Sequence, residues 1–342
     1  MKIVIAPDSY KECLSSREVA AAMADAVLQA CPSAEVVQIP LADGGEGTLD
    51  VLAGALGAKV HEARVSDPLG RTIDARFGTL GDTGIIEVAQ ACGLHLLAAA
   101  ERNPIIASSK GVGELIMETF WKGCRRLVIG LGGSATCDGG AGMLSVPGVK
   151  DALRETTVEL LCDVDNPFTG PEGAARVFAP QKGASPADVE ILETRMADLA
   201  RETAAETGVD VSSIPGAGAA GGLGGALIAY ADAEMTSGVD KVMLYTHFDA
   251  AIKDADIVFT GEGRSDSQTL KGKVPYGVLQ HCKGKRVALL SGAVDTSAIG
   301  ALSGAGFWAV RAVTPKDMCP QVAMDPEVAK QNISSAVIQT LS

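Results

Sequence analysis

Both ends of the chain alternate short apolar runs with helical patterns. Residues 3–6 and 36–39 are apolar runs that predict buried strands, and Ser15 with Glu18 predicts a capped helix start between them. Repeated strand, loop and helix predict a parallel sheet. Similar runs predict further strands at 127–129, 157–162, 256–260, 286–290 and 307–310. Helical patterns predict helices at 49–56, 111–122, 188–207 and 326–341.

The pattern changes between residues 59 and 90. Apolar and polar residues alternate there, and turn signals stand at 67–70 and 81–82. Such alternation is typical of antiparallel strands with one buried and one wet face. This stretch therefore predicts an antiparallel meander that belongs to a second domain.

Composition narrows the class of protein. The chain has 342 residues, 47% hydrophobic and 4% aromatic, so we expect a large aliphatic core and more than one domain. No apolar run approaches the roughly 20 residues that span a bilayer. The net charge of −13 disfavours nucleic acid or an anionic membrane as a partner. Eight cysteines and four histidines show no metal-ligand spacing, and no signal peptide is evident, which predicts a cytoplasmic protein.

Residues 125–140 combine a short apolar run with a glycine-rich loop that contains Ser134 and Asp138. Backbone amides of such a loop can cradle a phosphate, and Asp138 is a candidate metal ligand or proton acceptor. The alternative is a tight loop in which glycines relieve crowding and Asp138 caps a helix. Residues 130–135 also match G-x-G-x-x-A after a strand, whereas the G-x-G-x-x-G at 216–221 lacks the strand that a dinucleotide site needs.

Several predicted strands end in loops that mix glycine, a carboxylate and often a hydroxyl. These loops hold Asp8, Ser9 and Lys11; residues 43–48; Ser134 and Asp138; Asp163 and Asp165; and residues 261–266. Loops at the carboxyl ends of parallel strands meet in one crevice. Their composition favours metal-assisted phosphoryl transfer, in which amides and lysines hold phosphates and carboxylates hold Mg²⁺ or accept a proton. The candidates to grip an anion are Lys11, Arg71, Lys182, Arg264 and Lys273.

Together these motifs resemble the ATP-dependent glycerate kinases of the bacterial type-1 class. The resemblance rests on residues 6–11, 42–48, 67–71, 130–140, 162–167, 180–184, 216–222 and 260–263, with Asp266 and Gln268. It implies an α/β protein with two α/β domains and an active site in the cleft between them. One domain is Rossmann-like with a mostly parallel sheet, and the other has a mixed sheet with the meander. The expected boundaries are 1–57, 107–137 and 246–342 for the first domain, and 58–106 and 138–245 for the second.

The resemblance also implies an activity and a set of site residues. The γ-phosphoryl group of ATP passes to a hydroxyl of D-glycerate with Mg²⁺, giving 2-phosphoglycerate or, as the alternative, 3-phosphoglycerate, in a monomer or homodimer. The expected catalytic residues are Lys11, Asp43, Asp138 and Asp266, with Asp43 or Asp138 as the base. Expected substrate contacts are Asp8, Ser9, Glu46, Arg71, Gln181, Lys182 and Gln268. Expected nucleotide or phosphate contacts are Gly132, Gly133, Ser134, Gly261, Glu262, Gly263 and Lys273. The expected metal ligands are Asp163 and Asp266.

Three departures from the family pattern stand out. Cys137 replaces the usual asparagine before Asp138, and Lys110 replaces an aromatic residue. Between Met143 and Thr157, a short link stands where the family carries tens more residues. Two other functions stay open at this stage. The loop at 130–135 allows an NAD-dependent hydroxy-acid dehydrogenase, and the shortened segment allows a non-catalytic sugar-acid sensor.

Overall fold

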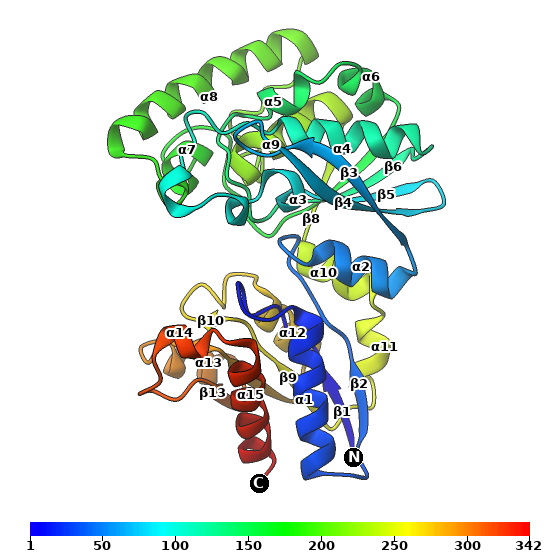
Figure 1. Cartoon of the computed structure of the whole chain (residues 1–342), viewed down its shortest axis with the longest axis vertical. Coiled ribbons are helices and arrows are strands. Elements are labelled where there is room, and N and C mark those ends of the chain that lie inside the picture. The colour runs from blue at the N-terminus through cyan, green and yellow to red at the C-terminus, as the bar shows by residue number, and fades with distance from the viewer. The chain divides into compact units, whose positions relative to one another are not determined.

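The structure is a computed structural model that describes residues 1–342. The chain divides into two compact units (Figure 1). Unit 1 consists of Met1–Asp43 and Val239–Ser342, and unit 2 of Gly44–Gly238. None of the helices combines the length and the apolar character that crossing a membrane requires.

Unit 1 is built on a five-stranded parallel sheet. Its strands, in spatial order, are β13 (Ala309–Ala312), β11 (Arg286–Ser291), β9 (Ile257–Thr260), β1 (Lys2–Ile5) and β2 (Glu35–Gln38). All four pairings are parallel, which confirms the predicted parallel sheet. A small parallel pair, β10 (Arg264–Ser265) with β12 (Ala293–Val294), lies beyond the sheet in the chain segments that follow β9 and β11.

The order of these strands creates a switch point between β1 and β9. The chain builds outward from β1 first to β2 and then, in the opposite direction, to β9, β11 and β13. In such doubly wound sheets, the loops on either side of the switch diverge and leave a crevice at the carboxyl ends of the strands. The hydrogen bonding between β1 and β9 continues past the ends of the strands, because Asp8 N donates to Gly261 O at 2.8 Å. The loops after β1 and β9 therefore start side by side.

The helices of unit 1 cover this sheet. They are α1 (Ser16–Ala30), α10 (Gly238–Tyr245), α11 (Phe248–Ile252), α12 (Val274–His281), α13 (Ile299–Ala305), α14 (Pro320–Ala323) and α15 (Pro326–Leu341). Helix α1 begins where the sequence predicts, since Glu18 N donates to Ser15 Oγ and Ser15 N donates to Glu18 Oε2. Helices α1 and α15 pack against each other, and their apolar faces share a core with Ile3, Phe259 and Leu290.

Unit 2 contains a six-stranded mixed sheet. Its strands are, in spatial order, β3 (Lys59–Ser66), β4 (Thr72–Leu80), β5 (Thr83–Glu87), β6 (Arg126–Gly130), β7 (Thr157–Leu161) and β8 (Glu234–Thr236). The first two pairings are antiparallel and the other three are parallel. The predicted meander is thus confirmed, and it continues into a parallel half-sheet. Together the two units confirm the predicted α/β class.

Eight α-helices surround the sheet of unit 2. They are α2 (Thr48–Leu56), α3 (Ala89–Cys92), α4 (Lys110–Trp121), α5 (Ala141–Leu144), α6 (Val149–Arg154), α7 (Ala174–Phe178), α8 (Pro186–Thr207) and α9 (Ala219–Ala231). Three 3₁₀ turns, η1 (Leu94–Leu96), η2 (Ala99–Glu101) and η3 (Pro180–Lys182), complete the unit. The predicted short link at residues 145–148 joins α5 to α6.

The division into units differs from the predicted domain boundaries. Strand β6 and helix α4 were expected in the Rossmann-like domain, yet β6 pairs in register with β5 and β7, where Val128 faces Ile85 and Glu159. Helix α2 also belongs to unit 2. The reason is physical: a strand buried on both faces carries the same apolar run in any parallel sheet, so the run does not identify its partners.

Candidate functional site

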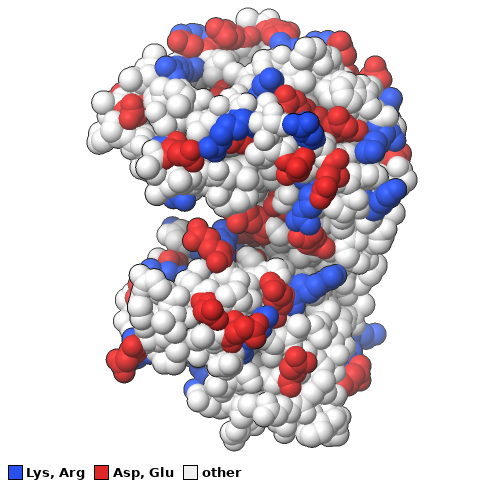
Figure 2. Space-filling view, viewed as in Figure 1, with Lys and Arg blue, Asp and Glu red and all other residues white.

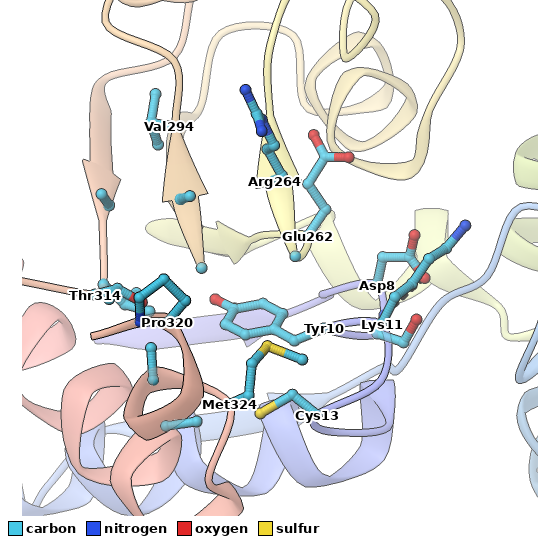
Figure 3. A pocket seen from close by; sticks show the side chains of 18 of the residues that line it. Asp8, Tyr10, Lys11, Cys13, Glu262, Arg264, Val294, Thr314, Pro320 and Met324 are labelled. Carbon is cyan, nitrogen blue, oxygen red and sulfur yellow. Dashed lines mark hydrogen bonds between the residues drawn. The ribbon is translucent and has the colours of Figure 1, made fainter. Parts of the chain in front are cut away.

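A cavity of about 620 Å³ opens at the switch point of unit 1 (Figure 3). Its volume is typical of sites for small ligands. Most of its charged groups gather at one end, and these are Asp8, Lys11, Asp43, Glu262, Arg264 and Lys273, whereas Lys316 lines it from the segment after β13. Ser9 and Gly263 line the same cavity, so unit 1 brings together eight of the candidate residues of the sequence analysis. Acidic and basic side chains are interspersed over the face shown in Figure 2, and the net charge is −13. An anionic ligand therefore needs local cations such as Lys11, Arg264 and Lys273.

Asp8 is the most perturbed carboxylate of this end. It is buried, and its Oδ1 accepts a hydrogen bond from Ser9 N at 2.7 Å. Burial and then the neighbouring charge of Asp43 raise the pKa of Asp8 well above its ordinary value, and Glu262 adds to the rise. The Ser9 amide and Lys11 oppose this change of the pKa without reversing it. A carboxylate with a raised pKa in a cavity is a good candidate proton acceptor.

Glu262 is held by a buried network. Its Oε1 accepts from Ser265 Oγ at 2.8 Å and from Thr269 Oγ1 at 2.6 Å, and its Oε2 lies 3.3 Å from Lys273 Nζ. Ser265 Oγ in turn lies 2.7 Å from Ser291 Oγ at the end of β11. Because only 4% of Glu262 is exposed, these bonds satisfy a carboxylate that water does not reach well. The network fixes Glu262 and places Lys273 at the cavity.

Tyr10 is a cavity residue that the sequence prediction missed. Its side chain is buried, and its hydroxyl donates to Leu290 O at 2.8 Å. Burial raises the pKa of Tyr10 far above its ordinary value, so the phenol stays protonated. Its only sequence signal is its place in the loop after β1. Gly261 explains the close approach nearby, since a Cβ there would lie 1.8 Å from Leu290 O.

Two predicted residues of the loop after β9 do not line the cavity. Asp266 Oδ1 accepts from Gln268 N at 2.7 Å, which forms a local turn of the kind that aspartate favours. Gln268 itself is exposed. Asp266 N also donates to Thr269 Oγ1 at 3.1 Å, so the arrangement gives Asp266 a structural role in shaping the loop.

In unit 2, the glycine-rich loop after β6 packs against the loop before α2. Gly132 N donates to Gly44 O at 3.0 Å, and a Cβ on Gly132 would lie 2.5 Å from the Cα of Gly45. A Cβ on Gly130 would lie 2.5 Å from Gly44 O. These glycines therefore allow two backbones to touch, which is the steric alternative of the sequence analysis. The Gly132 amide is thus used inside the protein, whereas the predicted phosphate contacts of Gly133 and Ser134 stay predictions.

Replacing Gly132 by alanine should destabilise the folded chain by about 2 kcal/mol or more, because the new Cβ overlaps the Gly45 backbone. Gly304 in α13 is the matched control, since a Cβ there meets nothing within 4 Å. Gly304→Ala should stabilise by about 0.5–1 kcal/mol through its helix propensity. Urea unfolding of both variants measures the two changes. Equal effects of the same sign would contradict the tight contact between the loops.

Lys182 is a buried cation beside this loop. Only 3% of it is exposed, and its Nζ donates to Ser134 Oγ at 2.9 Å and to Thr136 O at 2.7 Å. It forms no ion pair, and burial lowers its pKa, against opposing effects of Cys137, Cys92 and Asp138. An ammonium has three N–H donors, so one remains for a further acceptor. Gln181, its neighbour in η3, is exposed.

The polar groups of two predicted site residues are already paired with other residues of the protein. Asp138 Oδ2 accepts from Ser109 N, Ser109 Oγ and Gly142 N, and its Oδ1 accepts from Gly140 N. This carboxylate therefore fixes the start of α4 and α5 and is a poor candidate base. Arg71 contacts Asp67 at 2.5 Å and Glu101 at 2.8 Å, so two carboxylates already neutralise the cation that was expected to grip substrate.

The remaining predicted residues of unit 2 are engaged locally. Glu46 lies 3.5 Å from His95, and a Cβ on Gly133 would lie 3.2 Å from Glu46 Oε1. Asp163 Oδ1 accepts from Ser237 Oγ at 2.8 Å. No group of three or more His, Cys, Asp or Glu side chains is arranged to hold a metal ion.

Glu87 also shapes the predicted loop before α2, although no sequence pattern marks it. This buried residue lies at the end of β5, and its Oε2 accepts from Gly47 N at 3.1 Å and from Leu49 N at 3.0 Å. It therefore satisfies amides at the start of α2, where Gly47 has no side chain to do so. Burial raises the pKa of Glu87, with these backbone bonds opposing the rise.

Comparison with known proteins covers the whole chain. The model of the glycerate kinase family matches residues 3–151 and 144–342, and the two segments overlap within the stretch where the sequence predicts a shortened link. Glycerate kinase of Bacillus subtilis (strain 168) is 42% identical over 320 residues, which cover 85% of this chain and 84% of the relative. Glycerate 2-kinase of Escherichia coli (strain K12) is 42% identical over 313 residues, covering 83% and 82%. A crystal structure of a protein assigned as glycerate kinase 2 from Salmonella typhimurium LT2 superposes with a TM-score of 0.77 at 37% identity, covering 100% of this chain and 99% of that one.

Proposed function

Because the chain belongs to the glycerate kinase family, we propose that it transfers the γ-phosphoryl group of ATP to a hydroxyl group of D-glycerate. The observation that carries this proposal is the similarity to named glycerate kinases over more than four-fifths of both chains. The name glycerate 2-kinase of the Escherichia coli relative favours 2-phosphoglycerate as the product, with 3-phosphoglycerate as the alternative.

The switch-point cavity of unit 1 supplies the proton acceptor. A glycerate hydroxyl must lose its proton as its oxygen attacks phosphorus, and a positioned carboxylate is the usual acceptor. We assign this role to Asp8, because burial and Asp43 raise its pKa toward the range in which a base works well. Asp43 was the sequence candidate for the base. Its charge beside Asp8 gives it a part in setting that pKa.

Two lysines of the same cavity are suited to the phosphates. Lys11 lies near enough to Asp8 to lower its pKa, and Lys273 is placed by the fixed carboxylate of Glu262. Both line the cavity, together with the backbone of Gly263. We infer that they bind the polyphosphate of ATP and balance the charge that develops on the transferred group.

The carboxylates at this end also fit Mg²⁺. The repulsion that Asp43 and Glu262 exert on Asp8 is what a bound cation relieves, and carboxylate oxygens are the ligands that this ion prefers. Mg²⁺ takes only one or two carboxylates when ATP is present, so no cage of protein ligands is needed. We assign Asp43 as the residue that would hold it, with Asp266 and Asp163 as the further candidates from the sequence. When bound, the ion supplies positive charge to the phosphates.

Lys182 is suited to the carboxylate of glycerate. Arg71 is neutralised by Asp67 and Glu101, whereas Lys182 has no carboxylate partner and one N–H donor left over. A charge-assisted hydrogen bond from a buried ammonium to a carboxylate is strong, because water competes little. We therefore assign the binding of the substrate carboxylate to Lys182 within the predicted substrate set.

The test is ADP release from Mg²⁺ and ATP with D-glycerate, compared with L-glycerate, glycolate and lactate. We expect turnover with D-glycerate alone, and phosphorus NMR of the product to place the phosphate on the second carbon. Protection against thermal unfolding by NADH but not by ATP would instead support the dehydrogenase. Binding of D-glycerate and ATP without ADP release would support the non-catalytic sensor.

A further inference from the structure

The proposed roles use only the charged end of the cavity in unit 1. The other end is largely apolar, with Thr314 and Lys316 as its polar lining residues, and nothing in the proposed chemistry accounts for it. Its walls come from β12, from the segment after β13 and from α14. The apolar residues that line it are Val294, Val313, Pro315, Met318, Pro320 and Met324.

We propose that this apolar end binds the adenosine part of ATP, so that the segment at residues 313–324 decides which nucleotide the enzyme accepts. The inference rests on the proposed function for the choice of ligand, since a kinase of this family needs a nucleoside triphosphate. Neither the sequence motifs nor the names of the relatives assign this segment to the nucleotide.

The shape of the cavity supports an occupant with one apolar and one charged end. In Figure 3, Pro320 lies to the left of the Tyr10 ring and Met324 below it, whereas Asp8 and Lys11 lie to its right. The Tyr10 hydroxyl is anchored to Leu290 O, so its ring is held in the wall. Ring faces and methionine thioethers form good contacts with a flat heteroaromatic base. A nucleotide with its base at the apolar end therefore extends its phosphates toward Lys11 and Lys273.

The topology supports the same orientation. The charged end lies at the switch point between β1 and β9, and the apolar end lies beyond β11, next to β13. Ligands of doubly wound sheets lie across the carboxyl ends of the strands in this manner. The cavity volume of about 620 Å³ is also within the range that holds a nucleotide-sized ligand. Glycerate, with seven non-hydrogen atoms and no ring, would leave the apolar end unfilled.

Filling the apolar end tests the proposal by kinetics. Ala323 on α14 lines the cavity and is half-buried, whereas its neighbour Val322 is exposed and does not line it. Ala323→Phe should raise KM for ATP about tenfold or more, with kcat and KM for D-glycerate within about twofold of the parent, because only ground-state binding of the base is lost. Val322→Phe, on the same short helix, should leave all three constants unchanged. Equal KM for ATP in both variants and the parent would overturn the assignment.

Cys13 provides a readout that does not need turnover. It lines the cavity and is partly exposed, whereas Cys31 lies at the end of α1 outside it. In the parent protein, ATP and adenosine should each slow alkylation of Cys13 by iodoacetamide at least about threefold, as followed by peptide mass spectrometry. Inorganic tripolyphosphate should protect it less, and Cys31 should react at one rate throughout. Protection by tripolyphosphate but not by adenosine would overturn the placement of the base.

These experiments separate the inference from the proposed function. If D-glycerate gives no turnover while ATP and adenosine still protect Cys13, the acceptor is wrong and the adenosine site stands. If D-glycerate is phosphorylated while Ala323→Phe has no effect and Cys13 is not protected, the function stands and the adenosine site is wrong.

Discussion

Asp8→Asn should lower kcat about 10²–10⁴-fold and at the same time make the folded chain more stable at neutral pH. The loss of rate follows from removing the proposed proton acceptor, for which effects of this size are usual. Asparagine has the shape of aspartate and keeps an oxygen that accepts from Ser9 N, so the loop after β1 should keep its structure. KM for ATP should stay within about threefold of the parent value.

The size of this gain in stability depends on pH. The pKa of Asp8 is higher in the folded chain than in the unfolded chain, where it is about 3.9, so the folded state loses stability as the pH rises from that value through the folded pKa. Asparagine carries no charge at any pH. The variant should therefore match the parent in stability near pH 4 and exceed it increasingly as the pH rises, until the pH passes the folded pKa.

Thermal unfolding from about pH 4 to pH 8, together with steady-state kinetics, checks both effects. Asp25→Asn is the control, because Asp25 is an exposed residue on α1 of the same unit and should change neither property. A variant that loses rate and also loses stability at neutral pH would show that Asp8 is a structural ligand of its loop. Unchanged kcat would remove it as the base.

Local sequence signals predicted the helices and strands well. The capping pair of Ser15 and Glu18 starts α1 as expected, and α15 spans the predicted residues 326–341. These signals lie within one turn of the chain, so they are visible in sequence. The meander was equally predictable, because apolar and polar residues that alternate along a strand indicate one buried face and one face exposed to solvent.

Pairing between distant segments could not be predicted in the same way. Strand β6 joins unit 2 because its backbone lies between β5 and β7, and no feature of residues 127–129 names these partners. Tyr10 bonds to Leu290, which is 280 positions away, and the amide of Leu49 bonds to Glu87, which is 38 positions away. The contacts that build the site are of this long-range kind.

In the candidate site, too, sequence context does not distinguish glycines or aspartates that have different roles. Gly132 and Gly261 stand in similar loops after strands, yet the amide of Gly132 is used inside unit 2, whereas Gly261 borders the loop that lines the cavity. Asp8 and Asp138 are also alike in sequence context. Only their surroundings distinguish them, because Asp138 accepts four hydrogen bonds and Asp8 faces other carboxylates.

Lys182→Met should lower kcat/KM for D-glycerate about 100-fold and leave KM for ATP within about twofold of the parent value. The expected loss corresponds to one charge-assisted hydrogen bond from a buried ammonium, about 2–3 kcal/mol. Methionine has a similar length and no charge, so it fills the buried space that Lys182 occupies beside Ser134 and Thr136. Lys122→Met, at an exposed lysine of the same unit, should change neither constant.

An arginine variant distinguishes binding of the substrate carboxylate by Lys182 from the mere presence of a buried positive charge. Lys182→Arg keeps the cation, but a planar guanidinium cannot place its donors as the compact ammonium does on Ser134 Oγ and Thr136 O, so it should not restore kcat/KM. Burial lowers the pKa of Lys182, which means that the folded chain holds this proton at a cost that fades as the pH rises from the lowered folded pKa to the unfolded value of about 10.4. A substrate carboxylate bound to this cation would offset that cost. If Lys182→Met lowers only the melting temperature and D-glycerate is phosphorylated at the parent rate, Lys182 supports the loop after β6 and the substrate carboxylate is bound elsewhere.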